Sequence, residues 1–416
     1  MNALQSFIQQ IKTASTPSDI ERLLSVRISN SYLPQLNELV IEDQQLNTLV
    51  DSQGLFDENW LAYNEVVISF VQLARDLNPW SILELFDLYA TFLSNLCVAF
   101  NNQTYGHLLT PLVRSTIQVI IPMAKRLDFQ MYFKENCAQP RLAYLALILL
   151  KIFNHIRSQL ANATDGPAKM KVSIILLLGN NLCLIYFKLQ NPLLCQNIFS
   201  NMKNANLKIL SFPANEQIQY RYYLERFYTI KYQFADAFVH YKWCLESMWT
   251  VPNHPNFARI LKYFIPVGIL MGKPPSFDAI KAKCSGISAN TAFIPVYQEL
   301  CAAINSGNHR QLIEYLNRHQ DYLLLVGLYI PFGQKTTIIL VRNLVRKVWL
   351  ILGSQQRLSY EDVTTALALS VKGSPKADAF TFISQPVLVL AAENILLSLV
   401  NQNLLKGKLF LVNKSM

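Results

Sequence analysis

The chain has little charge and no long uncharged apolar run. Only 15% of its 416 residues are charged, against about 25% in typical soluble domains. Such a composition fits a membrane protein or a scaffold whose surfaces are covered by partners. The longest apolar stretch without charge, residues 172–187, contains two Asn and one Gly. It is shorter than the roughly 20 residues that span a bilayer. We therefore expect no transmembrane segment and no membrane contact.

Targeting and metal-binding patterns are also missing. The start, MNALQSFIQQIKTAS, lacks a basic region followed by an apolar core, so no signal peptide is expected. The six His have no metal-ligand spacing with Cys or with each other, so we expect no metal and no cofactor. The seven cysteines form no CxxC pair. This indicates reduced thiols in helical cores, and a cytosolic or nuclear protein.

Catalytic motifs are absent as well. There is no GxGxxG, HExxH or GxSxG in the chain. Residues 268–273, GILMGK, have three residues between the glycines instead of the four of a phosphate loop, and Pro274 follows. Glu225 and Glu246 have no partner that suggests acid–base chemistry. We predict that the protein is not an enzyme; an active site assembled only in space is the alternative that the sequence leaves open.

What the sequence does have is helical periodicity. Residues 215–273 predict two antiparallel helices, a polar turn and a third helix. Four of its residues fall at the offsets of a tetratricopeptide-type helix pair, namely Leu224, Tyr228, Ala237 and Tyr241. Such a pair cannot bury its apolar face alone, so it must stack on neighbours. Because residues 58–210 carry the same spacing, we predict an all-α fold built as a right-handed tetratricopeptide-like helical stack.

The C-terminal segment changes character. The predicted order is three helices and a hairpin, at 336–353, 358–371, 386–401 and 404–413, with a short strand at 379–383. This order is typical of a winged helix. The chain stops where a second wing strand is expected, so that strand is absent or the sequence ends early. The predicted parts are helical repeats over 1–210, a further helical part over 211–330 and the winged helix over 331–416.

Positive charge is concentrated in that last part. Residues 331–416 contain ten Lys or Arg and four Asp or Glu, and the whole chain has a net charge of +10. A patch of one sign is typical of proteins that bind polyanions, whereas the alternative is a solvated, solubilising face. Arg342 is the weakest candidate, since it can instead cap neighbouring carbonyls. The candidate nucleic-acid-binding residues are Lys335, Arg342, Arg346, Lys347, Lys372, Lys376, Lys406, Lys408 and Lys414.

Five segments carry a resemblance to a known family. They are ARDLNPWS (74–81), NPLLCQNIF (191–199), QIQYRYYLERFY (217–228), RILKYFIPVGILMGK (259–273) and VRNLVRKVWLIL (341–352). The chain resembles the PCI-domain subunit of the fungal TREX-two mRNA-export complex over most of residues 55–412. A sister family, the signalosome-associated PCI protein involved in splicing, shares the RILKYFIP run. The resemblance implies a PCI domain, in which a helical stack runs into a winged helix.

The resemblance also implies partners and a location. It implies a nuclear adaptor at the nuclear pore, in a heterotrimer with a large helical PCI-type scaffold subunit and a small acidic protein that also serves the proteasome lid. RNA or DNA is the further partner that the basic C-terminal part predicts. The rival hypothesis is a pure protein–protein scaffold of a signalosome- or splicing-associated complex, with no nucleic-acid role.

Two sets of residues are candidates for these protein contacts. Apolar residues in excess of what a small three-helix module needs are expected to meet the scaffold subunit: Trp349, Leu352, Val389 and Leu396. Interleaved basic and aromatic residues suit an acidic peptide: Lys203, Lys208, Tyr222, Lys231, Tyr232, Lys242 and Trp243. The alternative is that the first set is intramolecular core, and that in the second the aromatics are core and the lysines are solvated.

Overall fold

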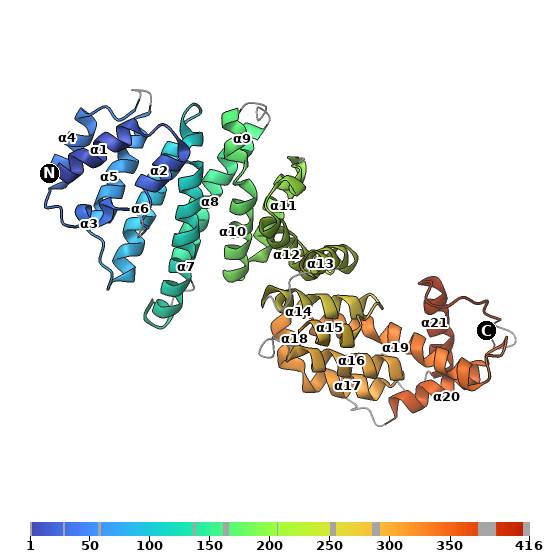
Figure 1. The fold of residues 1–416 in the computed structure, drawn as a ribbon. Helices are drawn as coiled ribbons and strands as arrows, with labels where there is room; N and C mark the ends of the chain where they lie inside the picture. Colours follow the sequence, from blue (N-terminus) through green and yellow to red (C-terminus); the bar gives the residue numbers. More distant parts are fainter. Residues whose placement is uncertain are drawn as a thin grey trace. The chain divides into compact units, whose positions relative to one another are not determined.

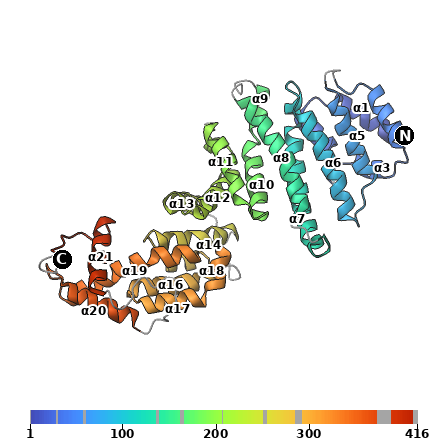
Figure 2. The same ribbon diagram turned by 180° about the vertical axis from the view of Figure 1, so that it is seen from behind.

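The computed structural model describes residues 2–27, 30–56, 60–135, 139–160, 166–205, 207–249, 255–284, 292–372 and 388–410. Over these ranges it contains 21 α-helices and no β-strand. The only β-type positions in these ranges are the isolated bridge residues Ser359 and Phe410. The helices form two compact units, residues 1–223 and 224–416. Figures 1 and 2 show the helices from opposite sides. The all-α prediction is confirmed, whereas the finer three-part division stays a prediction.

The first unit is a stack of helices joined by short turns. Its elements are α1 (Asn2–Thr13), α2 (Pro17–Leu23), α3 (Tyr32–Asn37), α4 (Asp43–Ser52), α5 (Ala62–Arg75), α6 (Ile82–Phe100), η2 (Gly106–Leu109), α7 (Thr110–Glu135), α8 (Pro140–Gln159), α9 (Gly166–Val172), α10 (Ile175–Lys188), η4 (Pro192–Leu194), α11 (Cys195–Asn204) and η5 (Ile209–Ser211). α5 packs on α6, α6 on α7, α7 on α8 and α8 on α10. α12 (Ala214–Ile230) carries the chain into the second unit.

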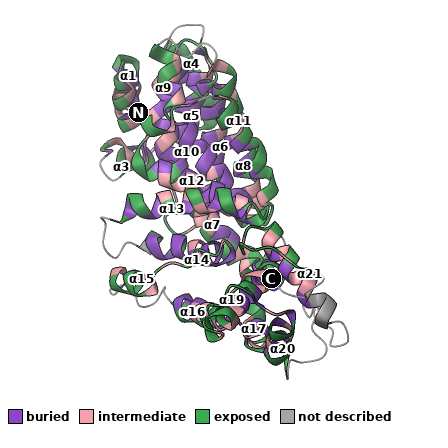
Figure 3. Cartoon of the chain, turned by 90° about the vertical axis from the view of Figure 1, so that its right-hand side faces the viewer, coloured by how far each residue is buried: buried purple, intermediate pink, exposed green. Residues whose placement is uncertain are grey.

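Local sequence signals decide where these helices begin and end. α2 begins at Pro17 after Thr16, whose side chain accepts a hydrogen bond from the backbone N–H of Asp19, as the sequence predicts. The buried carboxylate of Asp128 accepts from the backbone N–H of Leu142 at 3.0 Å and so caps the start of α8. Figure 3 shows buried residues in purple and exposed residues in green along the described helices.

One lysine lies deep inside the first unit. Lys171 is 1% exposed, and its Nζ donates to the backbone oxygen of Asn102 at 2.8 Å and lies 3.3 Å from Nε2 of His155. Burial lowers the pKa of Lys171 to about 8. Burial, and then the charge of Lys171, lower the pKa of His155 to about 4. The imidazole is therefore neutral at pH 7 and can accept a hydrogen bond from the ammonium.

The second unit surrounds the long helix α19. Its elements are α13 (Phe234–Met248), α14 (Pro255–Leu270), α15 (Phe277–Lys283), α16 (Phe293–Ser306), α17 (His309–Arg318), α18 (Gln320–Val326), α19 (Tyr329–Ile351), α20 (Tyr360–Val371) and α21 (Leu388–Asn401). α13 packs on α14, α16 on α17 and α19, and α20 on α21. Ala237 and Tyr241 of the predicted repeat pair are fully buried, which agrees with the close helix approach expected there.

Gly307 allows α16 and α19 to approach closely. It ends α16 with a φ of 68°, in the left-handed region that favours glycine. A Cβ at this position would lie 2.9 Å from the Cα of Leu344 in α19. The Gly307 carbonyl also accepts from the Ser370 hydroxyl at 2.7 Å, which ties this turn to α20. One turn therefore holds three helices of the second unit together.

Two expectations about the chain need correction. Ile82–Phe100 and Gly166–Lys188 are each long and apolar enough to cross a membrane, as is the bent pair α18 and α19 if counted as one span. The expectation that no segment reaches this length is wrong, because it required a run without any charge. α6 packs against α5 and α7, and α10 against α8 and α11. Packing within the helical stack thus buries part of the apolar surface of both segments.

The second correction concerns the C-terminal segment. α19 begins at Tyr329 instead of residue 336, because Pro331 in its first turn removes no hydrogen bond. The predicted strand over 404–413 is not formed in its described part, 404–410, where only Phe410 is a bridge position. The predicted strand at 379–383 and residues 411–413 lie outside the described ranges.

Candidate nucleic-acid interface

A groove of about 680 Å³ lies between α19 and the segment 404–410 in the second unit. One wall is a face of α19, and the other is the segment 404–410. The turn after α19 and Leu358 complete the lining. The residues used below are Arg342, Val345, Arg346 and Trp349 on α19, and Lys406, Lys408 and Phe410 on the segment.

Helical spacing explains the wall formed by α19. Residues three, four and seven positions apart share one face of a helix, so Arg342, Arg346 and Trp349 lie in a row on α19. The segment 404–410 forms the other wall through residues 404–408 and Phe410, whereas Leu409 does not line the groove.

The groove carries positive charge without a compensating carboxylate. Arg342, Arg346, Lys406 and Lys408 line it, and no Asp or Glu is among its described lining residues. None of the four takes part in an ion pair within the part of the chain that the structure describes. Arg342 also donates to the side-chain oxygen of Asn343 at 3.3 Å. A concave surface lined by one sign of charge attracts an anionic ligand.

Two aromatic side chains share this groove with the cations. Trp349 is 40% exposed and Phe410 is 46% exposed. The indole N–H of Trp349 donates to the backbone oxygen of Gln355 at 2.9 Å, which fixes the ring plane. Sequence reasoning assigned Trp349 to a protein partner and missed Phe410. The proximity of Phe410 to Lys406 and Lys408 in KGKLF, residues 406–410, was the signal that could have found it.

Of the other predicted cations, the three that the structure describes do not line the groove. Lys335 places its Nζ 4.8 Å from the ring centre of Phe234. Lys347 donates to the backbone oxygen of Ser306 at 2.9 Å, at the end of α16. Lys372 is exposed at the end of α20. Lys376 and Lys414 lie outside the described residues. Four of the nine candidates are therefore brought together, and packing directs two of the others elsewhere.

The apolar candidates for the scaffold contact differ in how far they are buried. Leu396 is fully buried, which favours the alternative that it is intramolecular core. Trp349 is partly exposed in the groove and Leu352 is half-buried. The side chain of Val389 is outside the described part of α21. Ile351, which the sequence did not single out, is 82% exposed at the end of α19.

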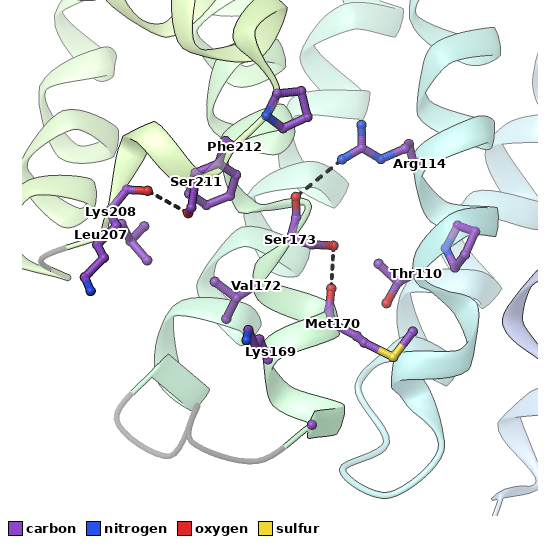
Figure 4. Close-up of a pocket in the computed structure, with 13 residues that line it drawn as sticks. Thr110, Arg114, Lys169, Met170, Val172, Ser173, Leu207, Lys208, Ser211 and Phe212 are labelled. Carbon is purple, nitrogen blue, oxygen red and sulfur yellow. Dashed lines mark hydrogen bonds between the residues drawn. The ribbon is translucent and has the colours of Figure 1, made fainter.

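A second pocket, of about 770 Å³, lies in the first unit (Figure 4). Figure 4 shows Arg114 pointing toward Ser173, whose backbone oxygen accepts from the guanidinium at 3.3 Å. Arg114 also pairs with the buried carboxylate of Glu216 at 2.6 Å. Lys169 and Lys208 are exposed at the pocket. The candidate residue Lys208 therefore lies beside a cavity that is also lined by the exposed Lys169 and by Arg114, which is paired with Glu216.

The remaining candidates for the acidic partner are placed within their own units. In the first unit Lys203 is exposed and Tyr222 is half-buried. In the second unit the ammonium of Lys231 lies 5.0 Å from the ring centre of Phe227. The others are Tyr232, which is exposed, Lys242, which pairs with Glu246 at 3.7 Å, and Trp243, which is half-buried.

Comparison with known proteins gives the class to which this architecture is similar. No family model matches the chain. A PCI domain-containing protein 2 homolog of Dictyostelium discoideum is 32% identical over 48% of this chain and 44% of its own length. A PCI domain-containing protein of Schizosaccharomyces pombe is 22% identical over 97% of this chain and 90% of its own length. The fold thus resembles that of PCI-domain proteins.

The name of a further relative gives a function and not only a domain. Nuclear mRNA export protein THP1 of Saccharomyces cerevisiae is 28% identical over 89% of this chain and 83% of its own length. The similarity spans both compact units. The resemblance predicted from the five sequence segments, to a PCI-domain subunit of the mRNA-export type, is therefore confirmed.

Proposed function

We propose that this chain is a non-enzymatic subunit of a nuclear mRNA-export complex and that it contributes RNA binding through the groove of the second unit. The observation that carries the proposal is the groove itself, where four cations converge and the described lining residues include no carboxylate. Similarity over nearly the whole chain to a nuclear mRNA export protein supports the cellular role.

The groove would hold the nucleic-acid backbone. Arginine and lysine side chains contact phosphate oxygens, and such contacts fix position without reading sequence. The four cations come from two walls, so a strand lying along the groove would meet charge on both sides. Binding would release condensed counterions, and affinity would fall steeply as salt rises. RNA and DNA both satisfy this chemistry, with RNA favoured by the proposed role in export.

The finer assignments extend this proposal. We assign residues 331–416 to a winged helix, within a heterotrimer docked at the nuclear pore. The exposed Ile351 supports a contact of this module with a large PCI-type scaffold subunit. The exposed Lys208, beside the pocket of the first unit, supports a contact with a small acidic protein.

The test neutralises the groove in the full chain. The variant carries Arg342→Gln, Arg346→Gln, Lys406→Gln and Lys408→Gln. If each cation contacts one phosphate, the slope of log K against log salt falls by about 2.8 in magnitude, at about 0.7 per contact. Between 50 and 200 mM salt, that slope corresponds to an affinity change of about 50-fold. Cells that carry the variant should retain polyadenylated RNA in the nucleus.

The scaffold hypothesis without nucleic acid is the second candidate, favoured by the exposed apolar end of α19. It predicts no change in RNA affinity or salt slope in the quadruple variant, with the partner subunits present or absent. It also predicts that the same variant loses an acidic subunit on co-purification from nuclear extract. That pair of results would replace the RNA-binding proposal.

A further inference from the structure

Besides its four cations, the groove contains two aromatic side chains. Trp349 lies on the α19 wall and Phe410 on the opposite wall, and each is close to half exposed. Large aromatic side chains are usually buried because burial removes apolar surface from water. Two that remain accessible inside one positively charged groove indicate a ligand with both an apolar, planar part and a negative charge.

The orientation of Trp349 is fixed before any ligand arrives. Its indole N–H is held by the backbone oxygen of Gln355, and the Cα of Trp349 belongs to a regular helix. Phe410 occupies a bridge position, which restrains the backbone from which its ring projects. Ligand binding would therefore cost little conformational entropy at these two side chains.

A nucleotide has the required chemistry. Its phosphate suits the arginines and lysines, and its base has a planar face that stacks on aromatic rings. The volume of about 680 Å³ is within the roughly 300–1,000 Å³ of pockets for small organic ligands. In a duplex, the bases are stacked on each other and paired, so they cannot enter such a groove, whereas bases of a single strand can.

We propose that the groove holds an unpaired nucleobase against Trp349 and Phe410, which makes the site selective for single-stranded RNA over duplex. This inference rests on the proposed RNA-binding function and adds a requirement for bases to the requirement for charge. Stacking tolerates every base, because each has a planar face. The site therefore selects for strandedness and reads no sequence.

The experiment measures affinity of the full chain for three probes at one salt concentration. They are a single-stranded oligouridylate, a ribose-phosphate chain of the same length without bases, and the duplex of oligouridylate with oligoadenylate. The wild-type protein should prefer oligouridylate to both other probes. Trp349→Leu and Phe410→Leu should each weaken oligouridylate binding by about 5- to 150-fold. Neither variant should weaken binding of the base-free chain.

A matched control is Leu369→Ala on α20, since Leu369 is 66% exposed, more than Trp349, and does not line the groove. Its oligouridylate affinity should equal that of the wild type. Phe410→Leu keeps the test valid if Trp349→Leu disturbs the turn through loss of the Gln355 hydrogen bond.

Each outcome decides one of the two proposals. Equal wild-type affinity for the base-free chain and oligouridylate would overturn the stacking inference and leave the phosphate groove standing. Unchanged oligouridylate affinity in both aromatic variants would also overturn the stacking inference, whether or not these variants lose a co-purifying protein subunit. If the wild type binds none of the three probes, the proposed RNA-binding function fails together with the inference.

Discussion

Gly307 offers a sharp test of the packing that positions the groove. Alanine at this position must adopt a φ of 68°, and its Cβ would lie 2.9 Å from the Cα of Leu344. The obstacle is the backbone of α19, which cannot rotate away as a flexible side chain can. Gly327 provides the control, because its φ is 77° but nothing lies within 4 Å of an added Cβ. Both glycines end helices of the second unit.

The two substitutions separate backbone strain from steric overlap. Left-handed backbone costs a non-glycine residue roughly 1–2 kcal/mol, so Gly327→Ala should destabilise the second unit by about that amount. Gly307→Ala adds overlap with a packed helix, at a further cost of about 1–3 kcal/mol. Out of a total stability of roughly 5–15 kcal/mol for a domain, such a loss is large.

Native-state amide hydrogen exchange, read by mass spectrometry, measures the effect without assuming that the two units unfold together. Peptides of α16 and α19 should exchange about 5- to 150-fold faster in Gly307→Ala than in Gly327→Ala. The first unit should be unchanged in both variants. Because α19 forms one wall of the groove, Gly307→Ala should also weaken RNA binding. Equal exchange in the two variants would refute the close approach of α16 and α19.

Two further predictions concern charge. Arg346→Gln with Lys406→Gln should reduce the magnitude of the salt slope of RNA binding by about 1.4, from two lost phosphate contacts. Lys335→Gln with Lys347→Gln removes the same charge but should leave the slope unchanged, because these side chains are held at Phe234 and at the end of α16; equal slopes in the two doubles would show that only net charge matters. The second prediction concerns His155, whose pKa is lowered to about 4 from its usual 6.5. The unfolded chain binds this proton first, so the first unit should lose stability as pH falls from about 6.5 to about 4, with no such effect above 6.5. His155→Gln should lose less on going from pH 7 to pH 5 in thermal unfolding, and an identical pH dependence in both proteins would contradict this explanation.

Helical structure was readable from the sequence because its causes are local. The three- and four-residue spacing of apolar side chains depends only on neighbours along the chain. The cap at Thr16 and the proline at the first position of α2 are contained within four residues. Breaks marked by Asn, Gly or Pro, such as 78–79 and 191–192, fall between the observed helices. The prediction of a strand at 404–413 was wrong over its described part, 404–410, because a strand needs a partner that its own sequence does not specify.

The excess of positive charge in residues 331–416 was also evident from the sequence, but its arrangement was not. Arg346 and Lys347 are adjacent in the chain, yet one lines the groove and the other caps α16. Successive residues on a helix point about 100° apart, so the side chains of Arg346 and Lys347 leave α19 in different directions. The sequence alone determines that separation. Which of the two meets the groove depends on where α16 and the segment 404–410 pack around α19, and these contacts join residues far apart in the chain, so only the tertiary structure decides them.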